Sequence, residues 1–258
     1  MKRPIALAAV VLSLGAACSK KGEVGLAPAA SSLAASTSAP TTMAWRFAVD
    51  ARTTTHVDMP GIKEHIQGDT TAASGTLDVV AKNLAQSRGA VRVDLLTFAT
   101  HTFGNEKDVT QTKHARTWLE VQVDEKVNEG LRWAEFAIRS IDGLSASDLT
   151  TVAAVKDADG EARTVTMTAH GDLLIHGHKV QRDAAVDVTF HYPAGAPADA
   201  KPARLEIKSR QPMRVVLKEH DVRPRDPLGA LADWTTNLIA KVADTADITV
   251  DVLANPSP

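Results

Sequence analysis

The chain has little of several features that proteins use for stability or recognition. It has one cysteine among 258 residues, so no internal disulfide can form. Aromatic residues make up only 4% of the chain, and the formal net charge at pH 7 is −2. Electrostatic nucleic-acid binders carry a basic stripe, so we expect no nucleic-acid partner. With few bulky rings and no disulfide, stability must come from packing of smaller aliphatic side chains.

The single cysteine, Cys18, follows a segment typical of secreted proteins. Lys2 and Arg3 precede an uncharged apolar run, residues 5–17, that ends in small residues. This is the pattern of a signal peptide and its cleavage site. As a helix the run would span roughly 20 Å, too short for a hydrocarbon core of ~30 Å. With a cysteine at the cleavage site, the segment resembles a bacterial lipoprotein signal, in which that cysteine is lipidated.

These observations predict three segments. Residues 1–17 form a lipoprotein signal peptide, residues 18–43 a lipidated and disordered tether, and residues 44–254 the folded domain. The tether is rich in Ala, Ser, Thr and Pro and has too few large apolar residues to order itself. We expect acyl chains on Cys18 to hold the protein at a membrane of the cell envelope, on the periplasmic side. The alternative is ordinary secretion with a coincidental cysteine.

Apolar and polar residues alternate in many short segments of the expected domain. Strict alternation indicates β-strands with one face in the core and the other in solvent. Asp142–Gly143, residues 157–160 and Gly177 carry turn signals between such segments. Many strands joined by turns favour a sandwich or a barrel. The alternating segments are residues 45–50, 91–95, 165–170, 186–190, 205–208 and 248–252.

Two segments break this alternation and predict helices. Residues 105–121 form the first, with Asp108 as a capping residue and Trp118 and Leu119 facing the sheet. Residues 228–242 form the second, because apolar residues recur every three or four positions. Its polar face has few Lys and Arg residues, so we expect packing on the sheet rather than on a membrane surface.

The order of these elements resembles the YceI-like family, which includes polyisoprenoid-binding periplasmic proteins. The resemblance extends from about residue 45 to residue 253, with a lengthened loop at 193–203 among its departures. It implies an all-β fold, an extended lipocalin-like antiparallel barrel of about eight strands with two short helices. The matching segments are residues 45–50, 54–59, 75–79, 91–100, 112–119, 134–141 and 171–177.

The inward-facing apolar residues are the candidate ligand-binding residues. If the barrel is hollow they line a tunnel for a long apolar chain, and if it is filled they form a closed core. An eight-stranded barrel is compatible with either state. The candidates are Phe47, Val93, Leu95, Phe136, Ile138, Met167, Leu173, Ile175, Val186, Val188, Phe190, Ile207 and Val215.

Polar candidates carry weaker signals. His176 and His178 could bind a metal ion, but Gly177 between them predicts a turn, and we interpret both as exposed polar residues at a strand end. His114, Arg116 and Glu120 could meet a ligand head group or form a solvated helix face. We find no Gly-x-Ser-x-Gly elbow and no dinucleotide fingerprint. We therefore expect no enzyme activity, no resident metal and no cofactor.

The expected function is binding of an apolar chain, such as an isoprenoid or a fatty acid, by a lipid-anchored envelope lipoprotein. The partners are then a long-chain apolar lipid and, through the acyl anchor at Cys18, a membrane. The first alternative is a structural or interaction module with a filled barrel that binds a protein partner. The second is an enzyme or metal protein built on loop residues.

Overall fold

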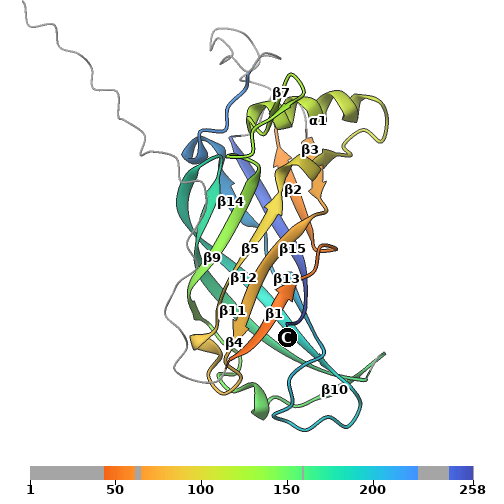
Figure 1. Cartoon of the computed structure of the whole chain (residues 1–258), viewed down its shortest axis with the longest axis vertical. Coiled ribbons are helices and arrows are strands. Elements are labelled where there is room, and N and C mark those ends of the chain that lie inside the picture. Colours follow the sequence, from red (N-terminus) through yellow and green to blue (C-terminus); the bar gives the residue numbers. More distant parts are fainter. Residues whose placement is uncertain (1–43, 62–64, 159, 226–243, 258) are drawn as a thin grey trace, which may run out of the picture.

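A computed structural model describes residues 44–61, 65–158, 160–225 and 244–257 of the chain. These residues form an elongated antiparallel β-barrel (Figure 1). Eight strands make the ring, which closes where Phe47–Val49 pairs with Ala254–Pro256. In ring order the strands are β1 (Trp45–Val49), β4 (Ala73–Val79), β5 (Arg88–Asp94), β9 (Trp133–Asp142), β11 (Gly160–Ile175), β12 (His178–Tyr192), β13 (Arg204–Ser209) and β15 (Thr245–Pro256).

Shorter elements extend the ring at its two ends. β2 (Thr54–Pro60), β3 (His65–Thr70) and β6 (Ala99–Thr100) continue the sheet from β15, and β14 (Met213–Val216) pairs with the other edge of β15. One end carries α1 (Lys107–Trp118) and the hairpin of β7 (Gln122–Val123) and β8 (Lys126–Val127), and the other carries β10 (Val155–Asp157) (Figure 1). We call these the α1 end and the β10 end. The 3₁₀ helices are η1 (Leu84–Gln86), η2 (Leu95–Thr97), η3 (Leu149–Thr151) and η4 (Leu217–His220).

The β11–β12 hairpin is the longest part of the ring. The segments 165–170 and 171–177, expected separately, belong to the single strand β11 and the turn after it. Ile175 pairs with His178 across a two-residue loop in which His176 and Gly177 both have positive φ, 51° and 74°. Two positive φ values are the signature of a type I′ turn. The turn expected at Gly177 is therefore confirmed.

The strand expected at residues 91–95, within the family-like segment 91–100, begins earlier and ends one residue sooner in the structure. β5 ends at Asp94, η2 follows, and β6 begins at Ala99. The carboxylate of Asp94 accepts a hydrogen bond from the backbone N–H of Leu96, and the Thr97 hydroxyl donates to the Asp94 carbonyl oxygen. These local bonds compete with the sheet ladder, so the chain turns here.

The helix expected at 105–121 is shorter, since α1 ends at Trp118. Asp108 lies in its first turn, where its carboxylate accepts hydrogen bonds from the backbone N–H groups of Phe103 and Asn105, while Glu106 is the N-cap residue. The expected segments 1–17 and 18–43, with Cys18, and the expected helix 228–242 lie outside the described residues. None of the described helices is long and apolar enough to cross a membrane.

Three apolar clusters pack the barrel interior, and the two larger ones lie toward its two ends. The cluster at the β10 end contains Phe47, Leu149 and Phe190, all almost fully buried. The cluster at the α1 end contains Val121 and Val215, which are also almost fully buried. The expected all-β fold with an eight-stranded barrel is confirmed, and the region between the two clusters holds the candidate site.

Candidate functional site

A cavity of about 170 Å³ lies inside the barrel, with walls that are almost entirely apolar. It extends from Leu77 and Met167, toward the β10 end, to Ile175 and Ile248, toward the α1 end. Nine of the thirteen candidate ligand-binding residues line it. They are Val93, Phe136, Ile138, Met167, Leu173, Ile175, Val186, Val188 and Ile207.

The period-two pattern explains why these nine side chains meet. Successive residues of a strand point to opposite faces, so residues of equal parity share the inner face. Cross-strand pairing brings Phe136 opposite Leu173 and Val188 opposite Ile207. Antiparallel neighbours on one face lie about 5 Å apart. The wall is therefore a continuous apolar surface across several strands.

Small residues account for the space between these walls. Ala169 on β11 pairs with Ala184 on β12, and Ala134 on β9 pairs with Val93 on β5, and all four line the cavity. An alanine leaves unoccupied the volume that a Leu or Phe would fill. A space of this size with almost entirely apolar walls disfavours water, which finds too few polar partners inside it.

The other four candidates fill the ends of the barrel instead of lining the cavity. Phe47 and Phe190 belong to the cluster at the β10 end, at 0% and 1% exposure. Leu95 and Val215 belong to the cluster at the α1 end, and Leu95 lies in η2 rather than in a strand. Strand parity correctly placed Phe47, Phe190 and Val215 inward, but it carries no information about height along the barrel.

Several lining residues were not among the candidates. Ile248, Val250 and Val252 carry the alternation that predicted a strand, so the same parity rule would have found them. Gln211 lies in the break between β13 and β14, and Met213 follows it; no sequence signal marks either residue. Met213 lines the cavity because β14 pairs with β15 beyond the end of β13, and Gln211 precedes it in the connecting segment.

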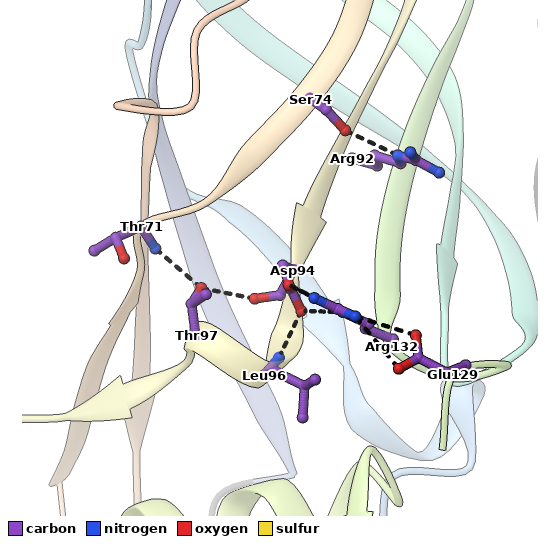
Figure 2. A network of polar contacts seen from close by, with 8 residues as sticks. All are labelled: Thr71, Ser74, Arg92, Asp94, Leu96, Thr97, Glu129 and Arg132. Atoms are coloured by element: carbon purple, nitrogen blue, oxygen red, sulfur yellow. Dashed lines mark hydrogen bonds and ion pairs between the residues drawn. The ribbon is translucent and has the colours of Figure 1, made fainter. Parts of the chain in front are cut away.

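A partly buried ion pair between Asp94 and Arg132 joins the strand ends near η2 (Figure 2). The guanidinium of Arg132 donates from Nε to Asp94 at 3.0 Å and from Nη2 at 2.6 Å, and it also contacts Glu129 at 3.1 Å. Burial by itself raises the pKa of the Asp94 carboxyl, but the bonds from Arg132 and from Leu96 N–H outweigh it, and the pKa lies below its ordinary value.

A cluster of polar residues lies at the tip of the β11–β12 hairpin, beside the α1 end. The His176 ring is 5% exposed, and its Nε2 lies 2.7 Å from Oε2 of Glu120. Arg225 also contacts this Glu120 oxygen at 2.7 Å. The expectation that His176 is an exposed polar residue is therefore wrong, because Glu120 and η4 pack against the hairpin tip.

The three polar candidates around α1 have different surroundings. His114 is exposed, as expected for a solvated helix face. Arg116 is partly buried and donates from Nε to the carbonyl oxygen of Phe98 at 3.0 Å. Glu120 lies just beyond the end of α1 with φ of 51° and contacts His176.

Comparison with known proteins decides the family. The family model described as the YceI-like domain matches residues 28–254, most of the chain. The chain belongs to the YceI-like family. The match includes every strand of the barrel ring, although β15 continues to Pro256.

Two solved structures are similar to this YceI-like chain. One is a polyisoprenoid binding domain from Saccharophagus degradans implicated in plant cell wall breakdown, with 13% identity and a TM-score of 0.49 over 82% of this chain and 98% of that one. The other is BcnA from Burkholderia cenocepacia, with 15% identity and a TM-score of 0.48 over 80% of this chain and 99% of that one. A search of curated proteins finds no significant match.

Proposed function

We propose that this YceI-like protein binds a long apolar chain, of the isoprenoid or fatty-acid type, inside its barrel. The observation that carries the proposal is the apolar cavity of about 170 Å³ between the two packed ends. Its walls offer methyl, methylene and ring surface, and such surface favours hydrocarbon over water. The description of one similar protein as polyisoprenoid binding agrees with the proposed ligand class.

The size of the cavity bears on the length of the ligand. An engineered cavity of about 150 Å³ in another protein holds benzene, so the present space accepts roughly six carbons without movement. A micromolar complex needs a net binding free energy of about 8 kcal/mol. The ligand's loss of translational and rotational freedom costs at least ~4 kcal/mol more, which the contacts must also supply. At ~0.8 kcal/mol per methylene, stable binding requires roughly 15 buried methylenes.

A chain of that length requires the cavity to widen. Met167 and Met213 both line it, and unbranched thioether side chains change rotamer more readily than β-branched residues do. The proposal therefore includes displacement of these two side chains when the ligand enters. Short-chain ligands should bind weakly, because they bury too few methylenes to offset the loss of freedom.

The proposed place of action is the periplasmic side of the cell envelope, with acyl chains on Cys18 as the membrane anchor. The support is the signal-like sequence before Cys18. Replacing Cys18 with Ser should abolish incorporation of a palmitate analogue and release the protein from the membrane fraction or leave it uncleaved. Equal labelling of both forms would contradict the anchor while leaving the barrel proposal untouched.

Native mass spectrometry of the full chain purified from its membrane tests the ligand proposal. The expected spectrum contains a noncovalent adduct with the mass of a long-chain lipid. Ala134→Trp should abolish the adduct with little loss of melting temperature, because the new ring occupies space that the ligand fills. Ser140→Trp, at an exposed position of the same strand, is the matched control and should retain the adduct.

The opposite result would favour a filled structural module. In a filled barrel, Ala134→Trp overpacks the core and destabilises it by roughly 1–3 kcal/mol. A wild-type protein that never carries lipid, together with such a loss, would overturn the binding proposal.

A further inference from the structure

Three metal-ligating residues meet at the tip of the β11–β12 hairpin. His176 and His178 flank Gly177, and Asp221 follows η4. One ligand atom from each lies within 4.8 Å of the other two. His176 is buried, whereas His178 and Asp221 are partly exposed, so an ion could enter from solvent.

The hydrogen bonds of His176 define which nitrogen is available. Its Nδ1 lies 3.1 Å from the carbonyl oxygen of His220, and because a carbonyl only accepts, Nδ1 carries the proton. The other nitrogen, Nε2, lies 2.7 Å from Oε2 of Glu120. In the neutral ring Nε2 presents a lone pair, and an ionised carboxylate also presents lone pairs. A cation between these two atoms, a proton or a metal ion, is needed to make the contact favourable.

This arrangement has the outer support that metal-ligating imidazoles have. Such a histidine usually donates its other N–H to a backbone carbonyl or a carboxylate, which fixes the tautomer and the ring orientation. The His220 carbonyl does this for His176. Asp221 is held similarly, because Arg223 Nη2 contacts its Oδ1 at 2.6 Å while Oδ2 is 4.0 Å from Arg225.

The backbone at these positions is unusual. Glu120, His176 and Asp221 have φ values of 51°, 51° and 53°, which residues other than glycine rarely adopt. The three residues come from different parts of the chain, the end of α1, the β11–β12 turn and the end of η4. Uncommon backbone conformations of this kind gather at ligand-binding sites.

We propose that His176, His178 and Asp221 bind one divalent transition-metal ion, and that Glu120, which contacts His176, moves in as a fourth ligand. Two imidazoles with carboxylates suit Zn²⁺, while Mg²⁺ and Ca²⁺ prefer sites made entirely of oxygen. Two ligands of tetrahedral zinc, each at ~2.0–2.1 Å from the metal, lie about 3.3 Å apart. The present 2.7 Å between His176 and Glu120 therefore has to widen only slightly.

The surrounding charges set the selectivity of the site. Arg223 and Arg225 balance Asp221 and Glu120, so the cluster has little net negative charge to attract a hard cation. Binding then depends on nitrogen donors, which favours zinc, nickel and copper over magnesium and calcium. The site lies at the hairpin tip outside the apolar cavity, so this proposal does not rest on lipid binding.

Calorimetric titration of the untagged, chelator-treated full chain with Zn²⁺ tests the proposal. We expect saturation at one ion per chain and no heat of binding from Mg²⁺ or Ca²⁺. Co²⁺ should give the visible absorption of tetrahedral coordination. Failure to saturate at millimolar Zn²⁺, or saturation by Mg²⁺ as readily as by Zn²⁺, would overturn the site.

Three variants test the ligands, and the substitutions at the two positive-φ positions are chosen to retain the local backbone conformation. His176→Asn retains the preferred Asn–Gly sequence of a type I′ turn, and Asp221→Asn keeps a residue that tolerates positive φ. His178→Ala removes a side chain with no hydrogen bond in the described part of the chain. Each should weaken Zn²⁺ binding by at least ~10-fold at unchanged circular dichroism. His114→Ala, at an exposed position on α1, should bind like wild type. Equal affinity in all four variants would refute the assignment.

Discussion

The imidazole of His176 donates to the carbonyl oxygen of His220, and the imidazole of His220 donates to the carbonyl oxygen of His178, two residues after His176. The distances from the two Nδ1 atoms are 3.1 and 2.9 Å. His220 is fully buried. These reciprocal bonds join η4 to the tip of the β11–β12 hairpin, so two segments 44 residues apart form one rigid end of the barrel.

Replacing His220 with Ala should destabilise the protein by about 2–4 kcal/mol, through the lost hydrogen bond and the cavity that remains. Burial lowers the pKa of His220, so the folded protein loses stability as the pH falls below the ordinary value of about 6.5. The His220→Ala variant does not lose stability in acid for this reason, because it has no imidazole to protonate on unfolding. Its deficit in melting temperature should be larger at about pH 8 than at about pH 5. A deficit that grows toward acid would contradict this assignment.

Gly171→Ala should cost roughly 1–3 kcal/mol, because the added methyl group has no room. A Cβ at this position would lie 2.5 Å from Cζ of Phe136 and 2.6 Å from the carbonyl oxygen of Ala137. The Phe136 ring lies against the glycine across the β9–β11 pair. Urea unfolding measures the loss. Gly130→Ala is the control, since its only near contact is Asn128 Oδ1 at 3.3 Å, and it should be close to neutral.

Arg132→Met should cost about 1–3 kcal/mol at neutral pH, because it leaves the buried Asp94 carboxylate without its main partner. The pKa of Asp94 is lowered, so its contribution to stability is present above about pH 4 and is lost as the pH falls through the lowered value. The wild-type advantage in chemical unfolding should therefore shrink in acid. Arg214→Met is the control, since its pair with Asp247 is exposed and its loss should change stability little.

The stabilisation that His170 provides should depend on pH in the opposite direction to that of Asp94. Its ring contacts Asp183 at 2.6 Å and Asp142 at 3.0 Å, and the hydrogen bond to Asp183, followed by that to Asp142, raises its pKa. A raised pKa means that the stabilisation is complete below the ordinary value of about 6.5 and is lost as the pH rises through the folded value. Wild type should melt above His170→Gln in mild acid, and the difference should vanish in alkali. A constant difference would show that the ring acts by packing alone.

Much of the barrel wall could be predicted from local pattern. Val186 and Val188 alternate with polar residues, and this fixed both their strand and the face they present. Leu95, near the α1 end, could not be assigned in the same way. Leu95 continues the alternation of Val91 and Val93, yet it lies in η2 because the Asp94 side chain and the Thr97 hydroxyl turn the chain. A period-two pattern of apolar residues does not reveal a turn that is formed by side-chain hydrogen bonds.

At the tip of the β11–β12 hairpin, the sequence predicts the turn but not the residues that meet there. Gly177 is enough to predict the turn, and from the turn alone both histidines are expected to be exposed polar residues. The structure instead gathers both imidazoles with Asp221, because η4 packs against the tip and the two-residue loop is tight. Glu120 reaches the same place from the end of α1. No spacing rule relates positions 120, 176 and 221.

The sequence by itself determined the strands, their inward faces and the family resemblance, because backbone alternation and side-chain polarity are local properties. Only the tertiary structure decided that the barrel has a cavity between its packed ends, and that His176, His178 and Asp221 meet at one hairpin tip with Glu120 against His176. Each of these depends on the register with which strands far apart in the chain pair. Register is fixed by the packing of the whole barrel rather than by any one segment.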